Sequence, residues 1–169
     1  MEGFIKLSIR DFTWVDLYKK ILVALDGSEP SYNALEHAVS IATNFNAKLI
    51  MLAVIQRVMI PIFPDEGFGG IPLSSVKGMA QYQERMREMY QSVLDEAMIQ
   101  IKEEHPGLMV EAVLKEGRPS ATITAFAENE GVDLIVMGSR GIGGYTGWIL
   151  GSTSRRVVDS CTKPVIIVK

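Results

Sequence analysis

The segment from Met137 to Ser154 holds the residues best suited to chemistry, because its glycines are spaced to expose backbone N–H groups. Glycine lacks a Cβ atom, so Gly138, Gly141 and Gly151 can adopt positive φ and let their N–H groups approach an anion closely. The chemistry that this pattern favours is the binding of phosphate oxygens by main-chain donors.

Three hydroxyl residues, Ser152, Thr153 and Ser154, follow these glycines and are predicted to open the last helix. The first N–H groups of a helix have no partner within it and lie at the positive end of its dipole, where phosphate binds well. The hydroxyls can donate to phosphate oxygens or hold a divalent ion beside them. Alternatively, the loop is a flexible connection in which Ser152 or Thr153 only caps the helix.

Two better-known phosphate-binding motifs do not occur in the sequence. It contains no G-x-x-x-x-G-K-[ST] segment, the pattern of a P-loop. Gly141-Ile142-Gly143 lacks the third glycine that a dinucleotide-binding fingerprint needs at position 146. The sequence therefore favours neither of these two classes of nucleotide-binding protein.

The predicted elements alternate between strands and helices, which indicates a mostly parallel sheet with helices on both faces. The predicted strands span about 21–25, 48–55, 109–114, 132–137 and 164–168, and the predicted helices about 28–44, 78–104, 121–130 and 153–160. Ser28 and Pro30 suit the start of the first helix, as a cap and a first-turn residue. Prolines and glycines interrupt residues 56–76, for which we expect a long surface loop.

The composition excludes several classes of function. The chain has 169 residues, which suits one domain, and its formal net charge of -3 argues against a nucleic-acid partner, since such proteins usually cluster Lys and Arg. No uncharged apolar run is long enough for a signal peptide or a transmembrane helix, so we expect no membrane partner. The single cysteine, Cys161, is compatible with a reducing cytoplasm, the location that we expect.

The glycine spacing resembles a known nucleotide-binding family. Gly138-x-x-Gly141, nine residues, and then Gly151-Ser152 is similar to the G-x-x-G-x9-G-[ST] motif of ATP-binding universal stress proteins. The resemblance extends over residues 19–169, through KKILVALDGSEPS near the start, VDLIVMGSRG before the loop and KPVIIVK at the end. It implies a Rossmann-like α/β fold of the adenine nucleotide alpha hydrolase type, with a five-stranded parallel sheet of order 3-2-1-4-5. Nucleotide would bind at the carboxyl ends of strands one and four, a topological switch point.

The same resemblance implies a site of twelve residues. Carried over position by position, these are Ala24, Leu25, Asp26, Val54, Met137, Gly138, Arg140, Gly141, Gly151, Ser152, Thr153 and Ser154. Backbone at Ala24, Leu25 and Val54 would border the adenine. Met137 would lie close to the sugar, and the members from Gly138 onward would cradle the phosphates, mainly through main-chain donors.

Two side chains of this site have alternative explanations. Asp26 would contact the ribose or a phosphate-bound metal, Mg²⁺ or Mn²⁺, yet an aspartate before a helix is also a frequent turn or capping residue. Arg140 can be a solvated loop charge that contributes only its N–H group to the site.

The family resemblance implies a stress-response regulator that binds ATP, ADP or AMP and acts through its nucleotide-dependent state. It also implies a homodimer paired through the C-terminal strand, residues 164–169, because a strand edge is a template for pairing. Two alternatives stay open: a slow ATPase or nucleotidyl-transfer enzyme, for which the sequence assigns no catalytic residue, and a nucleotide-free interaction module. Residues 1–18 depart from the family's usual start and are expected to form an arm on a partner subunit or a tail.

Overall fold

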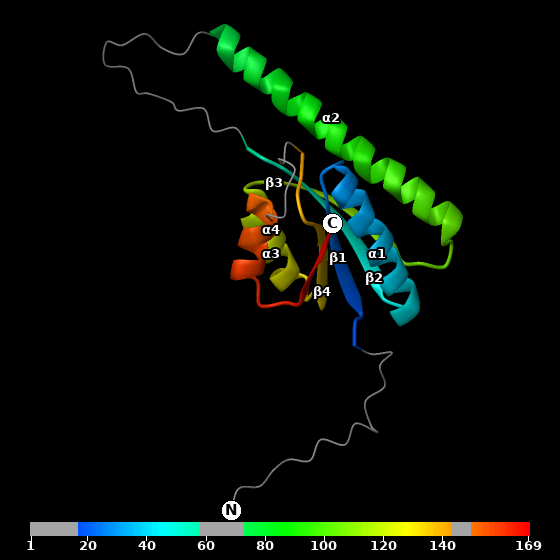
Figure 1. The fold of residues 1–169 in the computed structure, drawn as a ribbon. Coiled ribbons are helices and arrows are strands. Elements are labelled where there is room, and N and C mark those ends of the chain that lie inside the picture. Colours follow the sequence, from blue (N-terminus) through cyan, green and yellow to red (C-terminus); the bar gives the residue numbers. More distant parts are fainter. Residues whose placement is uncertain (1–16, 58–72, 143–149) are drawn as a thin grey trace, which may run out of the picture.

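The computed structural model describes residues 17–57, 73–142 and 150–169 (Figure 1). They form one layer of parallel strands between two layers of helices, which confirms the expected α/β class. The predicted arm, up to residue 16, and most of the predicted loop 56–76 lie outside the described residues.

The sheet has the strand order β3-β2-β1-β4-β5, and every neighbouring pair runs parallel, as expected. Its strands are β1 (Lys20–Leu25), β2 (Lys48–Ile55), β3 (Val110–Glu116), β4 (Leu134–Gly138) and β5 (Val165–Val168). β1 lies at the centre, where Leu22 is in register with Ile50 of β2 and Ile135 of β4. The carboxyl ends of β1 and β4 therefore lie side by side.

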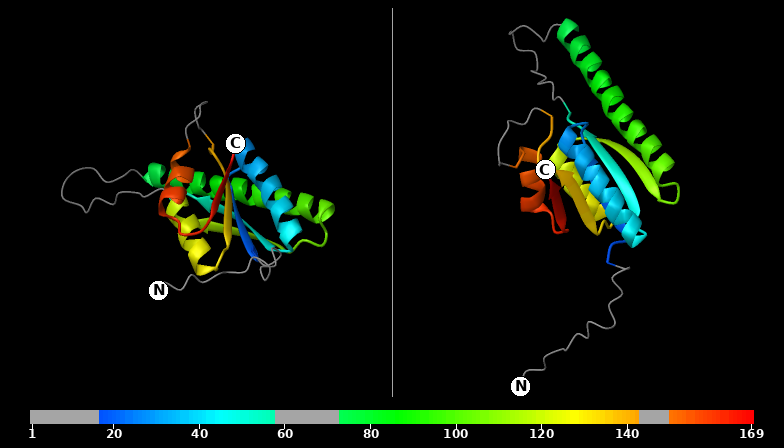
Figure 2. Two further views of the ribbon diagram at one scale, coloured as in Figure 1. Left: turned by 60° about the horizontal axis from the view of Figure 1, so that its bottom comes forward. Right: turned by 45° about the vertical axis from the view of Figure 1, so that its right-hand side comes forward.

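Helices cover both faces of this sheet, as the two views of Figure 2 show. They are α1 (Glu29–Phe45), α2 (Leu73–Glu104), α3 (Pro119–Asn129) and α4 (Ser152–Ser160). α1 and α2 pack on one face, whereas α3 and α4 lie on the other face and contact each other. Within the described ranges, none of the helices is both long and apolar enough to cross a membrane.

The central strand supplies side chains to two separate cores, because successive residues of a strand point to opposite faces. Ile21, Val23 and Leu25 join the core under α1 and α2. Leu22 joins the core under α3 and α4, and Ala24 packs against that core. Burial on both faces explains why β1 is an uninterrupted apolar run rather than an alternating one.

One element boundary differs clearly from the expected one. α2 begins at Leu73 rather than 78, so residues 73–76 are helical and do not belong to the predicted loop. Pro72 is the last proline of that stretch, and no glycine or proline follows before Gly78, so the chain can enter the helix directly after it. The other boundaries agree with the expected ones to within about two residues, the usual uncertainty of helix and strand ends.

Candidate functional site

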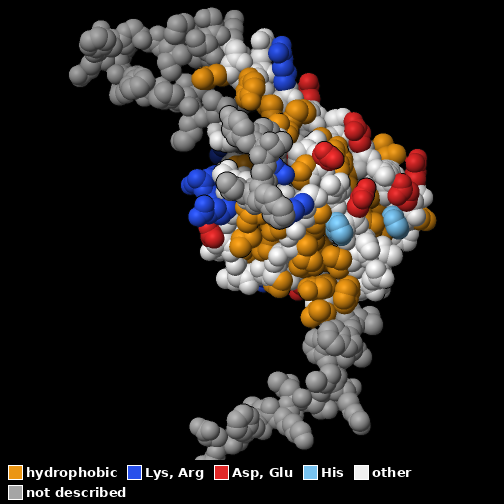
Figure 3. Space-filling view, in the orientation of Figure 1, with side chains coloured by type: hydrophobic (Ala, Val, Ile, Leu, Met, Phe, Trp, Pro, Cys, Tyr) orange, Lys and Arg blue, Asp and Glu red, His pale blue; other side chains and the backbone are white. Residues whose placement is uncertain are grey.

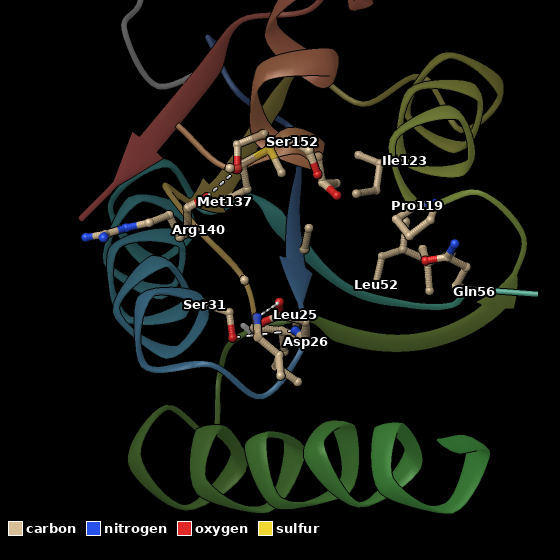
Figure 4. Close-up of a pocket in the computed structure, with 18 of the residues that line it drawn as sticks. Leu25, Asp26, Ser31, Leu52, Gln56, Pro119, Ile123, Met137, Arg140 and Ser152 are labelled. Carbon is tan, nitrogen blue, oxygen red and sulfur yellow. Dashed lines mark hydrogen bonds between the residues drawn. The ribbon is translucent and has the colours of Figure 1, made fainter. Parts of the chain in front are cut away.

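A cavity of about 390 Å³ opens at the carboxyl ends of β1 and β4 (Figure 4). The strand order reverses between these two strands, and ligands of open α/β sheets bind at such switch points. All the expected site residues line this one cavity: Ala24, Leu25, Asp26, Val54, Met137, Gly138, Arg140, Gly141, Gly151, Ser152, Thr153 and Ser154. The fold therefore brings together three segments that are far apart in the sequence.

The carboxylate of Asp26 joins the loop after β1 to the loop after β4. Its Oδ1 accepts hydrogen bonds from the N–H of Ser28, at 3.0 Å, and from the Ser28 hydroxyl, at 2.6 Å. Its Oδ2 accepts a hydrogen bond from the N–H of Ile142, at 3.1 Å. Asp26 is thus a turn residue and a cavity residue at once. Ser28 is the N-cap residue of α1, as expected, but its hydroxyl bonds to Asp26 and makes no side-chain bond to the helix.

Close packing, and not positive φ, is the reason for glycine at two positions of the motif. A Cβ atom at Gly138 would lie 2.7 Å from the carbonyl carbon of Pro30, and one at Gly141 would overlap the carboxylate of Asp26. The expectation of positive φ at the motif glycines is therefore wrong. Among the described glycines, positive φ occurs at Gly27 (84°), Gly117 (154°) and Gly131 (62°).

Ser154 connects the first turn of α4 to the end of β4. Its hydroxyl oxygen lies 3.0 Å from the carbonyl oxygen of Gly138 and 3.2 Å from that of Ser139, and its side chain is buried. The N–H of Gly151 donates to the same Ser139 carbonyl at 2.7 Å. These bonds satisfy backbone acceptors where β4 ends, and they hold the Ser154 side chain against the loop.

The beginning of α4 places at the cavity main-chain N–H groups that have no partner within the helix. Gly151 is the N-cap residue and has no side chain with which to cap the helix. Ser152 and Thr153 begin the first turn. Arg155 is the first residue of α4 whose N–H group donates within the helix, to the Gly151 carbonyl at 2.9 Å. The N–H groups of Ser152 and Thr153 come before it and have no partner within the helix. The arrangement suits an anion at this helix end. The side chain of Arg140, in contrast, extends away from the cavity (Figure 4).

Seven lining residues were not among those expected: Ser31, Leu52, Gln56, Tyr90, Pro119, Ile123 and Ile142. Tyr90 is the one of these seven residues that α2 contributes, and its phenol brings a polar group to the cavity. Burial, followed by the negative charge of Asp26 and by Tyr82, raises the pKa of Tyr90, so its phenol stays protonated and can donate a hydrogen bond. In the sequence Tyr90 is one member of a regular apolar stripe, a pattern that indicates packing and carries no sign of a site.

Comparisons with known proteins identify the family of this chain. Residues 17–169 match the sequence profile of the universal stress protein family. The chain belongs to the universal stress protein family. It is 33% identical over 156 residues to universal stress protein MJ0531 of Methanocaldococcus jannaschii, with 91% of this chain and 84% of that protein covered.

Two solved structures extend the similarity to three dimensions. The structure of protein MJ0577 has a TM-score of 0.66 at 30% sequence identity, and the match covers 90% of this chain and 96% of that chain. A universal stress protein crystallised in complex with cAMP has a TM-score of 0.59 at 25% identity, with coverage of 89% and 96%. These neighbours confirm the family and the fold expected from the sequence.

The contact between Gly138 and Pro30 gives a stability prediction. We expect Gly138→Ala to lower the free energy of unfolding by about 1–3 kcal/mol, because the added methyl group collides with backbone that cannot rotate away. Urea unfolding followed by circular dichroism measures this change. Gly78→Ala is the matched control: it lies in α2 with no atom within 4 Å of the new Cβ, and should stabilise by up to about 1 kcal/mol. An unchanged Gly138→Ala variant would contradict the packing argument.

Proposed function

We propose that this universal stress protein binds ATP, or a related adenine nucleotide such as ADP or AMP, and regulates a stress response through its nucleotide-bound state. One observation carries the proposal: the motif glycines, the start of α4 and Asp26 line a single cavity at the switch point. The relative crystallised with cAMP supports an adenine nucleotide as the ligand class. We also propose a cytoplasmic location, with which the unpaired Cys161 is compatible.

The cavity offers an apolar part and a donor-rich part, as a nucleotide requires. Adenine would lie against Ala24, Leu25 and Val54, with the sugar beside Met137. The phosphates would receive main-chain N–H bonds from the stretch between Gly138 and Ser154, at the positive end of α4. The volume, about 390 Å³, falls within the range of small-molecule sites.

A divalent ion, Mg²⁺ or Mn²⁺, fits this site only together with phosphate. The described residues contain no group of three His, Cys, Asp or Glu side chains that could hold a metal alone. Asp26 is the one carboxylate that lines the cavity in the described ranges. Mg²⁺ is commonly held by one or two carboxylates plus phosphate oxygens and water, so we propose Asp26 as its protein ligand.

The residues around the cavity favour a binding protein over a fast enzyme. The carboxylate of Asp26 already accepts three hydrogen bonds from the chain, and the protonated phenol of Tyr90 is a donor rather than a base. General base catalysis needs a group that can take a proton from water or another nucleophile. The assignment of Asp26 to metal or ribose thus leaves hydrolysis without a base among the described residues that line the cavity.

Nucleotide content tests the binding proposal directly. We expect protein that is denatured after purification to release an adenine nucleotide, and ATP with Mg²⁺ to raise its melting temperature. Asp26→Asn should weaken ATP binding about 10- to 100-fold by calorimetry, the loss of one charge-assisted interaction. Asp95→Asn, on the exposed surface of α2, is the matched control and should bind as the wild type does.

Chelation separates the two roles of Asp26. If Asp26 holds a metal, EDTA weakens binding to the wild type and has little further effect on Asp26→Asn. If EDTA changes neither protein, Asp26 contacts the ribose. Absence of released nucleotide together with absence of a thermal shift would overturn the proposal in favour of the nucleotide-free module.

Hydrolysis is the second measurement. We expect single-turnover hydrolysis of bound ATP, followed by rapid quench, to be slower than about 1 per second, an ordinary enzymatic rate. The physical reason is the missing base described above. A faster reaction would show that the protein is an ATPase or nucleotidyl-transfer enzyme.

The C-terminal strand supports a homodimer. β5 is an edge strand, paired only with β4 in the sheet, and Ile166 is 36% exposed. An exposed edge strand can pair with a second copy across a two-fold axis. We propose that residues 164–169 form this interface.

Ile166→Asp tests the interface, because a two-fold axis brings the two new charges close together. We expect light scattering at micromolar concentration to show a dimer for the wild type and a monomer for Ile166→Asp. Ile99→Asp, on an α2 residue that is 59% exposed, is the control and should remain dimeric. A monomeric wild type would refute the interface.

A further inference from the structure

A second cavity lies between α1 and α2 and shares no lining residue with the candidate nucleotide cavity. It encloses about 470 Å³. We call it the α1–α2 groove: Leu35, Val39 and Ile101 form its apolar floor, and the exposed side chains of Glu36 and Glu104 lie at its rim. The proposed nucleotide site does not involve this groove.

The rim of the groove is negatively charged. Acidic side chains gather over α1 and α2, with the histidines among them (Figure 3). Within the described part of the chain, neither Glu36 nor Glu104 takes part in an ion pair, although Gln100 donates a hydrogen bond to Glu104 at 3.0 Å. A complementary occupant therefore carries apolar side chains flanked by basic ones.

The N-terminal part of the chain enters the fold beside this groove. Tyr18 packs edge-on against Phe45, the last residue of α1, with ring centroids 5.1 Å apart. The residue before Phe45, Asn44, lines the groove. The chain that precedes Leu17 therefore starts from the end of the groove that Asn44 marks.

Residues 4–10 have the composition that the groove requires. They read Phe-Ile-Lys-Leu-Ser-Ile-Arg, with four apolar residues, two basic residues and no acidic residue. Fully extended chain spans about 3.3 Å per residue, so the length of chain between residues 10 and 17 allows a span of up to about 20 Å. From Asn44 to Leu35, α1 extends only about 14 Å at 1.5 Å per residue. The tether is long enough to lay residues 4–10 along the groove.

We propose that residues 4–10 of this chain dock into its own α1–α2 groove. Their apolar side chains lie on the floor, and Lys6 and Arg10 reach the rim carboxylates of Glu36 and Glu104. Long basic side chains can bury their methylene groups on apolar surface and keep the charge at the edge. The proposal does not rest on the nucleotide site.

A single tryptophan in the segment reports docking. The sequence has two tryptophans, so Trp14→Phe with Trp148→Phe removes both, and Ile9→Trp then adds one probe in the full-length chain. We expect acrylamide, a neutral quencher, to quench this probe less in the native protein than in urea. Phe4→Trp in the same background is a second probe. If both probes are quenched as strongly in the native protein as in urea, the proposal is wrong.

Charge reversal tests where the segment docks. Glu36→Lys with Glu104→Lys should weaken docking about tenfold, the loss of two exposed ion pairs, and raise the quenching of the probe. Adding Lys6→Glu with Arg10→Glu restores opposite charges and should restore protection. If the two Glu→Lys substitutions do not raise the quenching of the probe, the assignment to this groove is wrong. It is also wrong if the added Lys6→Glu and Arg10→Glu substitutions do not lower the quenching again.

A matched control and a dilution series complete the test. Glu88→Lys with Asp95→Lys makes the same change in net charge on exposed residues of α2 outside the groove and should leave quenching unchanged. Protection of the probe should be independent of protein concentration over a hundredfold range, because docking is within one chain. Protection that disappears on dilution would mean that the segment docks on a second copy, which contradicts the proposal.

Discussion

The carboxylate of Asp26 is the contact on which the geometry of the cavity depends. It accepts hydrogen bonds from the N–H groups of Ser28 and Ile142, and so connects its own loop to one that lies 116 positions further along the chain. Neither loop has a sheet partner at this point, and a carboxylate can accept from several backbone donors at once. Gly141 follows from the same contact, because any Cβ there would displace the carboxylate.

The remaining parts of the cavity depend on backbone packing more than on side chains. Gly138 lies so close to Pro30 that the end of β4 rests on the start of α1. The Ser154 hydroxyl then binds the carbonyl of Gly138 and holds the first turn of α4 against the same strand end. The main-chain donors of this cavity are therefore placed by the fold and not by a lysine side chain of the P-loop type.

α1 connects this cavity to the rest of the molecule. Ala34, Ala38 and Ala42 are completely buried at helical spacing, and such small side chains let the helix lie close to β1 and β4. Ser31 of the same helix lines the first cavity, while Val39 lines the α1–α2 groove. One closely packed helix thus borders both cavities.

Much of this structure was predictable from local patterns in the sequence. The continuously apolar strands led to the correct fold class through short-range rules on burial. The glycine spacing led, through the family that it resembles, to Asp26 and the other residues that share one cavity. Local patterns could not show why the motif glycines are needed, since the atoms they avoid belong to Pro30 and Asp26, far away in the chain. Tyr90 was missed for the same reason: its spacing indicates a packed helix face, and only the crossing of α2 over the end of β1 brings its phenol near Asp26. Sequence therefore determined the elements and the backbone donors, whereas the tertiary structure decided which distant side chains meet them, because contacts between remote segments depend on how the layers pack.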